Sequence, residues 1–374
     1  MGVYEELGVR RIINAKGTYT ALGGSRMSRE TLEAMADAAS SFVDIDQLQR
    51  ALGKKIAEMT HNEAAYICDG ACSGVYLALL ACVSLKTGKK VPYLTAADRA
   101  QSEIILFRSH VSPYSFVFDQ LGVRAVELGY SNHPGWTTAE DIENAITEHT
   151  AAIYYMESGW LAPGAPELET VCAVAQKHGV PVVLDAAAML PPVENLWRYC
   201  ERGADVAIFS GGKDLRGPQA SGLMVGSKRI IDTILDFGFP KPGMGRMMKV
   251  GREEMAGLYT ALKQFLASDP LEAVQDAEAQ VILAHTILSG SPCFEVRRCY
   301  PNEAGQPIAR AGVHLKDTRV SMEDVLRYLE EGEPAIIAAA DCCDNRLFYL
   351  NPMSMTMEEM ELVCKKLRTY KIED

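Results

Sequence analysis

Apolar segments of strand length alternate with segments of helical periodicity between residues 64 and 226. This alternation predicts a mostly parallel sheet covered by helices, which is an α/β fold. The segment 181–184 is apolar throughout, as expected for a parallel strand buried on both faces. The expected strands lie at 64–68, 103–107, 123–128, 151–156, 181–184, 205–209 and 221–225, and the expected helices at 74–84, 139–147 and 168–177.

The rest of the chain predicts an N-terminal arm and a smaller domain. Short strand candidates alternate with helix-like segments from about residue 268 onward, which indicates a small C-terminal α/β domain. We expect residues 1–49 to form an arm that packs with this small domain, residues 50–260 to form the large domain, and residues 268–374 to form the small one. The expected strands of the small domain lie at 294–298, 311–315, 335–339 and 346–350, and its expected helices at 271–289, 322–330 and 357–367.

The composition fits a globular enzyme. The chain has 374 residues, of which 48% are hydrophobic and 23% are charged. No apolar run reaches the length of a membrane span, and the first residues lack the layout of a signal peptide, so we expect a cytoplasmic protein without a membrane partner. The formal net charge of −12 argues against a broad nucleic-acid surface.

Ten cysteines are scattered without regular spacing, which fits reduced thiols. Cys342 and Cys343 are adjacent, and the sequence has no CxxC pair, so we expect no metal site.

Lys213 follows an apolar strand candidate and the residues Ser210, Gly211 and Gly212. An amine held at a strand end, with its pKa lowered, can carry a cofactor aldehyde. The two glycines allow the backbone to approach a bound group, and the Ser210 hydroxyl can bind a phosphate. A surface lysine in a glycine turn explains this motif about equally well when it is taken alone.

Asp185 ends the apolar run that precedes this motif. A carboxylate at the end of a buried strand costs desolvation energy unless it faces a cation, and a pyridinium nitrogen is such a cation. For Asp185 alone, capping of the next segment is the commoner role. However, one helix-like and one strand-like segment separate Asp185 from Lys213, so a single βαβ step could bring both residues to one crevice.

With these motifs the chain resembles the fold-type I pyridoxal phosphate enzymes. Within them it is similar to the branch of bacterial selenocysteine synthase and the D-glucosaminate-6-phosphate ammonia-lyase type. The resemblance implies the transferase fold of these enzymes, pyridoxal 5'-phosphate as cofactor, and a homodimer or higher oligomer in which the arm packs near the active site. It covers most of the chain and rests also on residues 12–18, 20–25, 42–45, 69–74, 184–188 and 209–217.

The segment Asp69 to Gly74 follows a strand candidate and opens an apolar helix. The backbone N–H groups of Gly70, Ala71 and Cys72 would therefore point at an anion, which suits the cofactor phosphate. A plain tight turn is the alternative for a glycine loop taken alone.

Two residues are candidates for the faces of the cofactor ring. In the enzymes that the chain resembles, a flat ring stacks on the pyridine, and His110 lies in a similar place. Ala187 would lie under the opposite face, where a small side chain leaves room. A lone histidine is more often structural.

The substrate is expected to be a small anionic amine. Arg26, Arg216, Arg246 and Lys249 lie in segments that the resemblance places near the cleft, and such cations bind carboxylates and phosphates. Each of them taken alone is more often a solvated charge. The glycine-flanked segment 245–251 holds two of these cations and could close over an anion as a lid.

One segment departs from the family pattern. In the enzymes that the chain resembles, the strand after a proline such as Pro334 tends to end in an arginine that could bind the substrate carboxylate. Here this strand ends in alanines, among them Ala339. The relatives' substrate therefore does not transfer directly to this chain.

The resemblance implies β-elimination on an amino acid or amino sugar acid, which yields a 2-keto acid and ammonia. Lys213 would carry the cofactor and then serve as general base, and Asp185 would keep the ring nitrogen charged. Two alternatives stay open. One is selenium or sulfur transfer to a seryl group on tRNA, and the other is a cofactor-binding protein without turnover.

Overall fold

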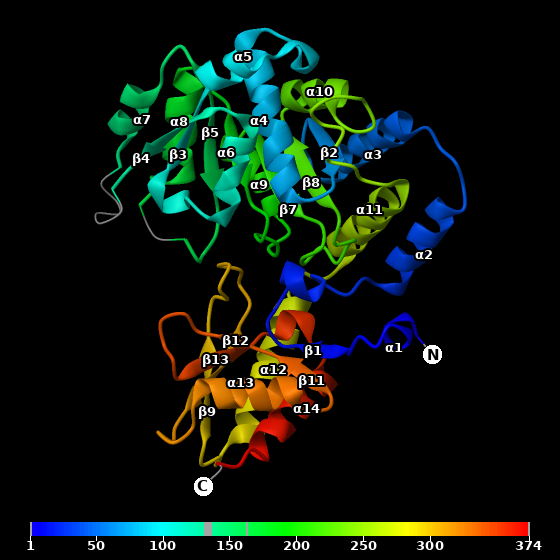
Figure 1. Cartoon of the computed structure of the whole chain (residues 1–374), viewed down its shortest axis with the longest axis vertical. Helices are drawn as coiled ribbons and strands as arrows, with labels where there is room; N and C mark the ends of the chain where they lie inside the picture. The colour runs from blue at the N-terminus through cyan, green and yellow to red at the C-terminus, as the bar shows by residue number, and fades with distance from the viewer. Residues whose placement is uncertain (1, 131–136, 162–163, 373–374) are drawn as a thin grey trace. The chain divides into compact units, whose positions relative to one another are not determined.

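The computed structural model of the chain describes residues 2–130, 137–161 and 164–372 (Figure 1). The chain divides into two compact units. Unit 1 comprises Met1–Arg26 together with Ser268–Asp374, and unit 2 comprises Met27–Ala267. The large sheet and the candidate catalytic residues Asp185 and Lys213 belong to unit 2.

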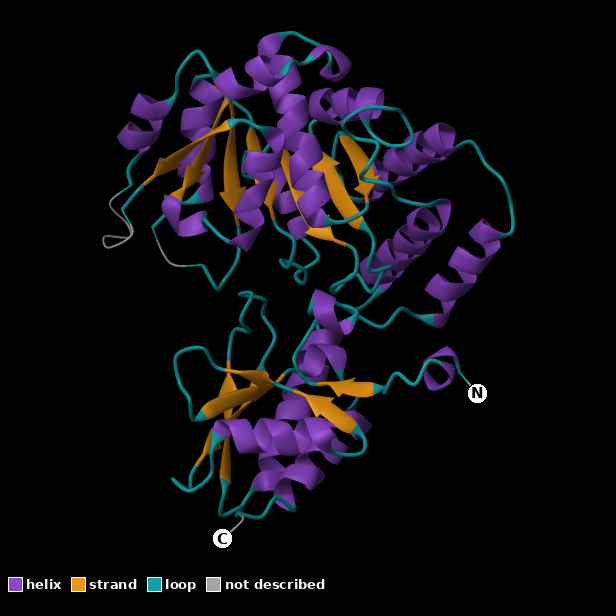
Figure 2. Ribbon diagram, in the orientation of Figure 1, coloured by secondary structure: helices purple, strands orange, loops and turns teal. Residues whose placement is uncertain are grey.

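Within the described residues, a sheet of seven strands crosses unit 2 in the order β2-β8-β7-β6-β5-β3-β4. Figure 2 draws its strands in orange among the helices of the unit. Strand β8 is antiparallel to both of its neighbours, and the other pairs are parallel. The expected mostly parallel sheet is therefore confirmed, and each expected strand agrees with the structure to within one residue at either end. The strands are β2 (Ala64–Cys68), β3 (Glu103–Phe107), β4 (Arg124–Leu128), β5 (Thr150–Met156), β6 (Val182–Asp185), β7 (Val206–Ser210) and β8 (Gly222–Gly226).

Helices cover both faces of this sheet (Figure 1). One apolar core lies under α4, α6 and α10, and a second lies under α3, α8, α9 and α11. Helix α4 is buried along most of its length because its sequence is apolar on every side. The helices of unit 2 are α2 (Arg29–Ala39), α3 (Ile45–Met59), α4 (Ala71–Thr87), α5 (Ala96–Gln101), α6 (Phe116–Leu121), α7 (Ala139–Ala145), α8 (Leu168–Lys177), α9 (Asn195–Glu201), α10 (Lys228–Phe237) and α11 (Arg252–Ala267), with short 3-10 turns at Val91–Tyr93, Arg108–His110 and Pro113–Ser115.

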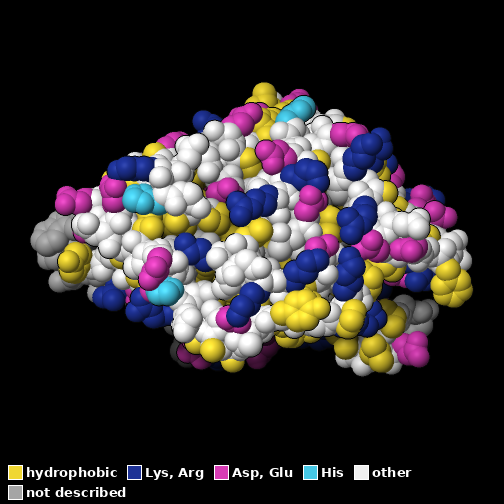
Figure 3. Space-filling model, turned by 90° about the horizontal axis from the view of Figure 1, so that it is seen from above, with side chains coloured by type: hydrophobic (Ala, Val, Ile, Leu, Met, Phe, Trp, Pro, Cys, Tyr) yellow, Lys and Arg dark blue, Asp and Glu magenta, His cyan; other side chains and the backbone are white. Residues whose placement is uncertain are grey.

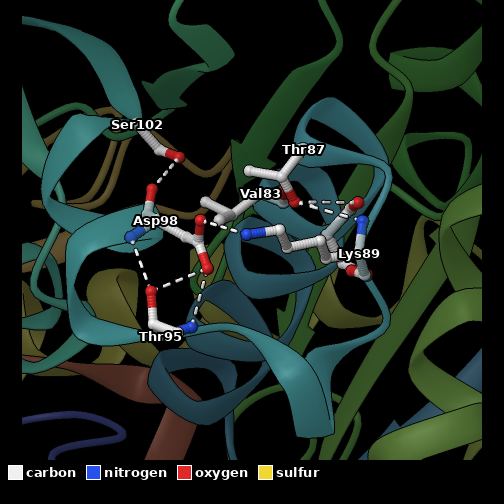
Figure 4. Close-up of polar contacts among 7 residues, drawn as sticks. Val83, Thr87, Lys89, Thr95, Asp98 and Ser102 are labelled. Atoms are coloured by element: carbon white, nitrogen blue, oxygen red, sulfur yellow. Dashed lines mark hydrogen bonds and ion pairs between the residues drawn. The ribbon is translucent and has the colours of Figure 1, made fainter.

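A polar network joins the end of α4 to α5 and so fixes the approach to β3 (Figure 4). Thr95 caps α5, and its hydroxyl accepts from the Asp98 amide (3.1 Å) while the Thr95 amide donates to Asp98 Oδ2 (2.9 Å). Lys89 Nζ also donates to Asp98, over 2.6 Å. These contacts, the Lys89 hydrogen bond first, lower the pKa of Asp98 to about 2, so the capping carboxylate stays ionised.

Unit 1 has a core of its own. Among its described residues, β9 (Phe294–Cys299), β10 (Arg310–Leu315), β12 (Ala339–Ala340) and β13 (Leu347–Leu350) form an antiparallel sheet in the order β12-β13-β10-β9, and β1 (Ile12–Asn14) pairs with β11 (Ala335–Ile337) in parallel. The helices are α1 (Val3–Glu6), α12 (Glu272–Leu288), α13 (Met322–Glu331) and α14 (Met357–Arg368), with 3-10 turns at Thr20–Leu22 and Pro352–Ser354.

The segment expected as an arm, residues 1–49, is divided between the two units. Residues 1–26 join unit 1, and residues 27–49 join unit 2, which therefore begins well before residue 50. Helix α2 packs on α11 because Ser28 Oγ donates to Gln264 Oε1 (2.8 Å) and Arg252 Nε donates to the Ala38 carbonyl (2.9 Å). None of the described helices of either unit is long and apolar enough to cross a membrane.

Candidate active site

The carboxyl ends of several strands of unit 2 meet at one edge of the sheet. Strands β2, β6 and β7 run in the same direction, because β2 and β7 are both antiparallel to β8 and β6 is parallel to β7. Their last residues are followed by the segments that hold Gly70, Ala187 and Lys213. The structure thus brings the sequence-predicted cofactor residues to a single edge, as expected for ligand sites in open α/β sheets.

Asp185 is buried at this edge and accepts two hydrogen bonds. The Ala187 amide donates to its Oδ1 (3.0 Å), and the Tyr154 hydroxyl donates to its Oδ2 (3.2 Å). Burial raises the pKa of Asp185 above its ordinary value, while the Ala187 amide, the charge of Lys213 and the Tyr154 hydroxyl oppose that rise. A cationic partner, such as a protonated ring nitrogen, would stabilise the ionised form of this buried carboxyl.

Lys213 is half-buried in a tightly closed loop after β7. The Gly211 amide donates to the Ser221 carbonyl (2.9 Å), and the Gly217 amide donates back to the Gly211 carbonyl (2.8 Å). A Cβ on Gly211 would collide with Ser221, and one on Gly212 would lie 2.6 Å from the Cα of Gln219. Only glycine fits at these two positions, so the fold itself accounts for the Gly-Gly pair before Lys213.

Arg216, in the same loop, has a backbone conformation that is unusual for a residue with a side chain. Its φ is 51°, in the left-handed region, and its amide donates to the Lys213 carbonyl (2.9 Å). Such a conformation costs about 1–3 kcal/mol and is held by the surrounding loop. The guanidinium is exposed, so it can approach a solute from the loop that carries Lys213.

The N-terminus of α4 offers unpaired backbone amides beside the strand ends. The Gly74 amide makes the first helical bond, to the Gly70 carbonyl (2.9 Å), which leaves the amides of Ala71 and Cys72 without a partner inside the helix. No described atom lies within 4 Å of the position that a Cβ on Gly70 would take. The open space and the free amides suit an anion such as a phosphate.

Three buried side-chain oxygens at this edge have no hydrogen-bond partner among the described residues. They are Asp69 Oδ1 after β2, Ser109 Oγ after β3 and Ser158 Oγ after β5. Buried polar atoms are normally paired, so unpaired ones gathered at one edge of a sheet indicate a place where a polar group binds. The edge therefore fits a cofactor that carries a phosphate and a ring nitrogen, together with a polar substrate.

His110 is buried beside the end of β5. Its Nδ1 accepts from the Met156 amide (3.2 Å), and its ring packs edge-on against Phe107 and Tyr155. Burial lowers the pKa of His110 to about 4, so the imidazole is neutral near pH 7. With Nδ1 accepting, the proton of the neutral ring lies on Nε2. A neutral flat ring is consistent with the predicted stacking role, which stays a prediction.

Ser210 and Ala187 are joined through the backbone. The Ser210 amide donates to the Ala187 carbonyl (3.2 Å), so the expected phosphate hydroxyl and the expected small residue under the ring belong to neighbouring strand ends. Their assignment to the cofactor stays a prediction.

Of the four cations predicted for the substrate, Arg216 lies in the same loop as Lys213, whereas Arg26, Arg246 and Lys249 lie in other segments. Their role with the substrate stays a prediction. Arg26 belongs to unit 1, where Glu359 holds its guanidinium through both carboxylate oxygens (2.9 and 2.7 Å). The exposed Arg246 lies over the ring of Phe239 (5.1 Å), and Lys249 is exposed in the same loop. Two contacts hold that loop to helices of unit 2. Lys241 pairs with Asp46 of α3 (3.1 Å), and Met244 Sδ accepts from Arg99 of α5 (3.7 Å).

Two residues at the site were not predicted from the sequence. Tyr154 shares its face of the sheet with Asp185, and its hydroxyl is the only polar atom of its side chain. The second residue is Glu157, whose amide donates to the Asp185 carbonyl (2.9 Å). Burial raises the pKa of the Glu157 carboxyl. Tyr154 is one of two tyrosines in β5, and its role beside Asp185 becomes visible only when the pairing of β5 with β6 is known.

We predict that Tyr154→Phe weakens the function of Asp185. Losing a hydrogen bond to a charged group costs about 1.5–3 kcal/mol, so kcat should fall roughly 10- to 100-fold, with a smaller change in KM. The pKa of Asp185 should rise further, which moves the acid limb of the kcat profile to higher pH. The measurement is the pH profile of kcat together with a cofactor titration. Tyr155→Phe is the matched control, since that hydroxyl bonds to the Pro166 carbonyl instead. Equal pH profiles for both variants would contradict this role.

Comparison with known proteins places the chain in a family. The family model for SelA, L-seryl-tRNA selenium transferase, matches residues 12–283. The chain is 30% identical to D-glucosaminate-6-phosphate ammonia lyase of Salmonella typhimurium strain 14028s, over 98% of this chain and 97% of that protein. It is 35% identical to a 5'-C-glycyluridine monooxygenase-decarboxylase of a Streptomyces species, over 71% of this chain and 65% of that protein.

The structural comparison agrees with the sequence comparison. A solved structure of D-glucosaminate-6-phosphate ammonia-lyase superposes with a TM-score of 0.83 and 29% identity, and the match covers 98% of this chain and 97% of that one. The fold and its neighbours thus define a fold-type I pyridoxal phosphate enzyme, with pyridoxal 5'-phosphate as cofactor. Within that class the chain belongs to the SelA family.

Proposed function

We propose that this protein is a pyridoxal phosphate-dependent ammonia lyase. It eliminates a β-hydroxyl from a small anionic 2-amino acid or 2-amino sugar acid, such as a phosphorylated glucosaminate. The observation that carries the proposal is the extent of the likeness to D-glucosaminate-6-phosphate ammonia lyase, which spans 98% of the chain and both of its units. The SelA family model, by contrast, stops at residue 283.

When bound, pyridoxal phosphate supplies an electron sink that stabilises negative charge on the substrate carbon next to the amine. Asp185 would hold a proton at the ring nitrogen, and its buried position strengthens that interaction. The amides of Ala71 and Cys72, with the Ser210 hydroxyl, would bind the phosphate. The neutral ring of His110 would flank the cofactor opposite Ala187.

Lys213 would hold the cofactor through its Nζ and then act on the substrate. With the substrate amine at the cofactor, the Lys213 amine would be placed to accept the proton from the substrate Cα. Loss of the β-hydroxyl as water leaves an enamine, and hydrolysis of that enamine gives the 2-keto acid and ammonia. The elimination releases one water molecule and the hydrolysis of the enamine consumes one. The overall reaction is therefore a deamination with no net change in water from these two steps.

Substrate anions would be bound by cations at the open side of this edge. Arg216 is the best-placed of the predicted cations, because it is exposed in the loop of Lys213. We propose a homodimer or higher oligomer in which Arg246 and Lys249 serve a neighbouring copy. The exposed apolar side chains of Val3, Tyr4 and Leu7, with exposed fractions of 62%, 52% and 68%, support an interface near the N-terminus.

A second candidate is the activity named by the family model, selenium transfer to seryl-tRNA. It begins with the same elimination and needs a surface that binds tRNA. The face seen in Figure 3 intersperses Lys and Arg with Asp and Glu, and the formal net charge is −12. Neither observation favours a polyanionic partner.

We expect ammonia and a 2-keto acid to appear in equal amounts when the holoenzyme is given a phosphorylated 2-amino sugar acid. The unphosphorylated acid should be turned over with a higher KM, because one anionic contact is lost. Parallel assays measure oxygen consumption and a gel shift with seryl-tRNA. Ammonia release absent from every substrate, together with a tRNA shift or with oxygen uptake, would overturn the lyase assignment in favour of one of the relatives' activities.

A further inference from the structure

Two adjacent thiols lie outside the candidate active site, in the loop between β12 and β13 of unit 1. Cys342 and Cys343 are both exposed, and their Sγ atoms lie 3.5 Å apart. A carboxylate oxygen of Asp341 joins them, and the three candidate ligand atoms lie within 4.8 Å of one another. Two soft sulfur ligands and one oxygen ligand therefore lie close together at the surface.

Hydrogen bonds hold the Asp341 carboxylate in place. Its Oδ1 accepts from the Cys343 and Asp344 amides, both over 2.8 Å, and its Oδ2 accepts from the Tyr349 hydroxyl (2.6 Å). Oδ2 accepts a single hydrogen bond and keeps a lone pair for a further partner.

Tyr349, which bonds to Asp341, is itself held by residues of the small sheet. The Tyr349 ring lies under the Arg310 guanidinium, 3.8 Å from ring centroid to Cζ, and Arg310 is paired with Glu303 (2.9 Å). Arg310 is itself buried on β10. Because Arg310 and a strand hold Tyr349, the carboxylate at the loop is oriented before any ligand arrives.

We propose that Asp341, Cys342 and Cys343 form a binding site for a soft divalent cation of the zinc group. Two thiolates bound tetrahedrally to zinc at about 2.3 Å lie about 3.8 Å apart, close to the spacing of these sulfurs. A carboxylate oxygen of Asp341 supplies the third ligand, and water fills the fourth position on the exposed side. Binding replaces two S–H protons by two metal–sulfur bonds and releases both protons, with no change of oxidation state.

The CxxC criterion does not detect such a site. The sequence predicted no metal because it lacks the usual spacing of zinc ligands. Here the turn made by Asp341 brings the sulfurs together.

Cadmium binding to the reduced holoenzyme tests the proposal. Equilibrium dialysis should show one equivalent of Cd²⁺ that is released by excess Zn²⁺, with a sulfur-to-cadmium charge-transfer band in the ultraviolet. The double variant Cys342→Ser/Cys343→Ser should lose this equivalent and its band. Cys299→Ser, which alters a half-buried thiol of the same unit, should keep both. An equivalent that survives in the double variant would overturn the proposal.

A second comparison tests the carboxylate ligand. Asp341→Asn keeps an oxygen for the two amides but lacks the anionic ligand, so Cd²⁺ affinity should fall at least about tenfold. Phenylarsine oxide needs only the two thiols, so its binding should persist in Asp341→Asn and fail in the double variant. Arsenical binding without any cadmium equivalent in the parent enzyme would show a dithiol that does not hold a cation, and the cation site would be rejected.

Discussion

Replacing Lys213 with alanine is expected to abolish turnover, lowering kcat by at least about 10⁴-fold, because general-base action alone contributes about 10²–10⁴-fold. The variant also loses the only amine that the proposal gives to the cofactor aldehyde. Borohydride treatment of the parent enzyme should fix the cofactor to the peptide that contains Lys213, as seen by mass spectrometry. The same treatment of Lys213→Ala should leave the chain at its unmodified mass.

Two further variants distinguish the role of the Lys213 amine in holding the cofactor from the role of its positive charge. Lys213→Arg keeps a cation in the loop but offers no amine to an aldehyde, so it should be as inactive as the alanine variant. Lys228→Ala removes a surface lysine that pairs with Asp232 on α10, and it should keep full activity and cofactor attachment. Borohydride-stable cofactor on the Lys213→Ala chain would mean that another lysine carries it.

The large sheet could be predicted from the sequence because its strands are buried on both faces. Such strands leave continuous apolar runs, and all seven expected runs became strands. The direction of β8 could not be foreseen, since an antiparallel strand buried on both faces has the same apolar pattern as a parallel one. The motifs of Asp185 and Lys213 were visible because each lies directly after such a run.

Contacts between segments far apart in the chain could not be predicted from the sequence. Arg26 is held by Glu359, more than three hundred positions away, and no local pattern signals that pair. The Tyr154 hydrogen bond to Asp185 requires the register of β5 against β6. The same limit applies to the sulfurs of Cys342 and Cys343, whose orientation comes from a turn and not from their spacing. Sequence reasoning finds residues that share a strand end and misses those that long-range pairing brings together.

Asp185→Asn is expected to separate the stability of the apoprotein from that of the holoenzyme. Burial raises the folded pKa of Asp185 above its ordinary value of 3.8, so its contribution to stability is fully present below that value and is lost as the pH rises through the folded pKa. Asparagine has no such titration and keeps an acceptor for the Ala187 amide. Relative to the parent, the variant apoprotein should therefore gain free energy of unfolding between pH 5 and pH 8 in urea denaturation.

The holoenzyme should show the opposite order. Without the carboxylate, the ring nitrogen loses its partner, and removing one member of a buried pair costs about 3–5 kcal/mol, so kcat/KM should fall roughly 10³-fold. Cofactor affinity should fall too, which shrinks the rise in Tm on adding pyridoxal phosphate. Asp205→Asn is the control, because that half-buried carboxyl bonds to the Val182 amide at the opposite ends of these strands. If Asp185→Asn keeps the parent's cofactor-dependent rise in Tm and its kcat/KM, Asp185 does not face the cofactor.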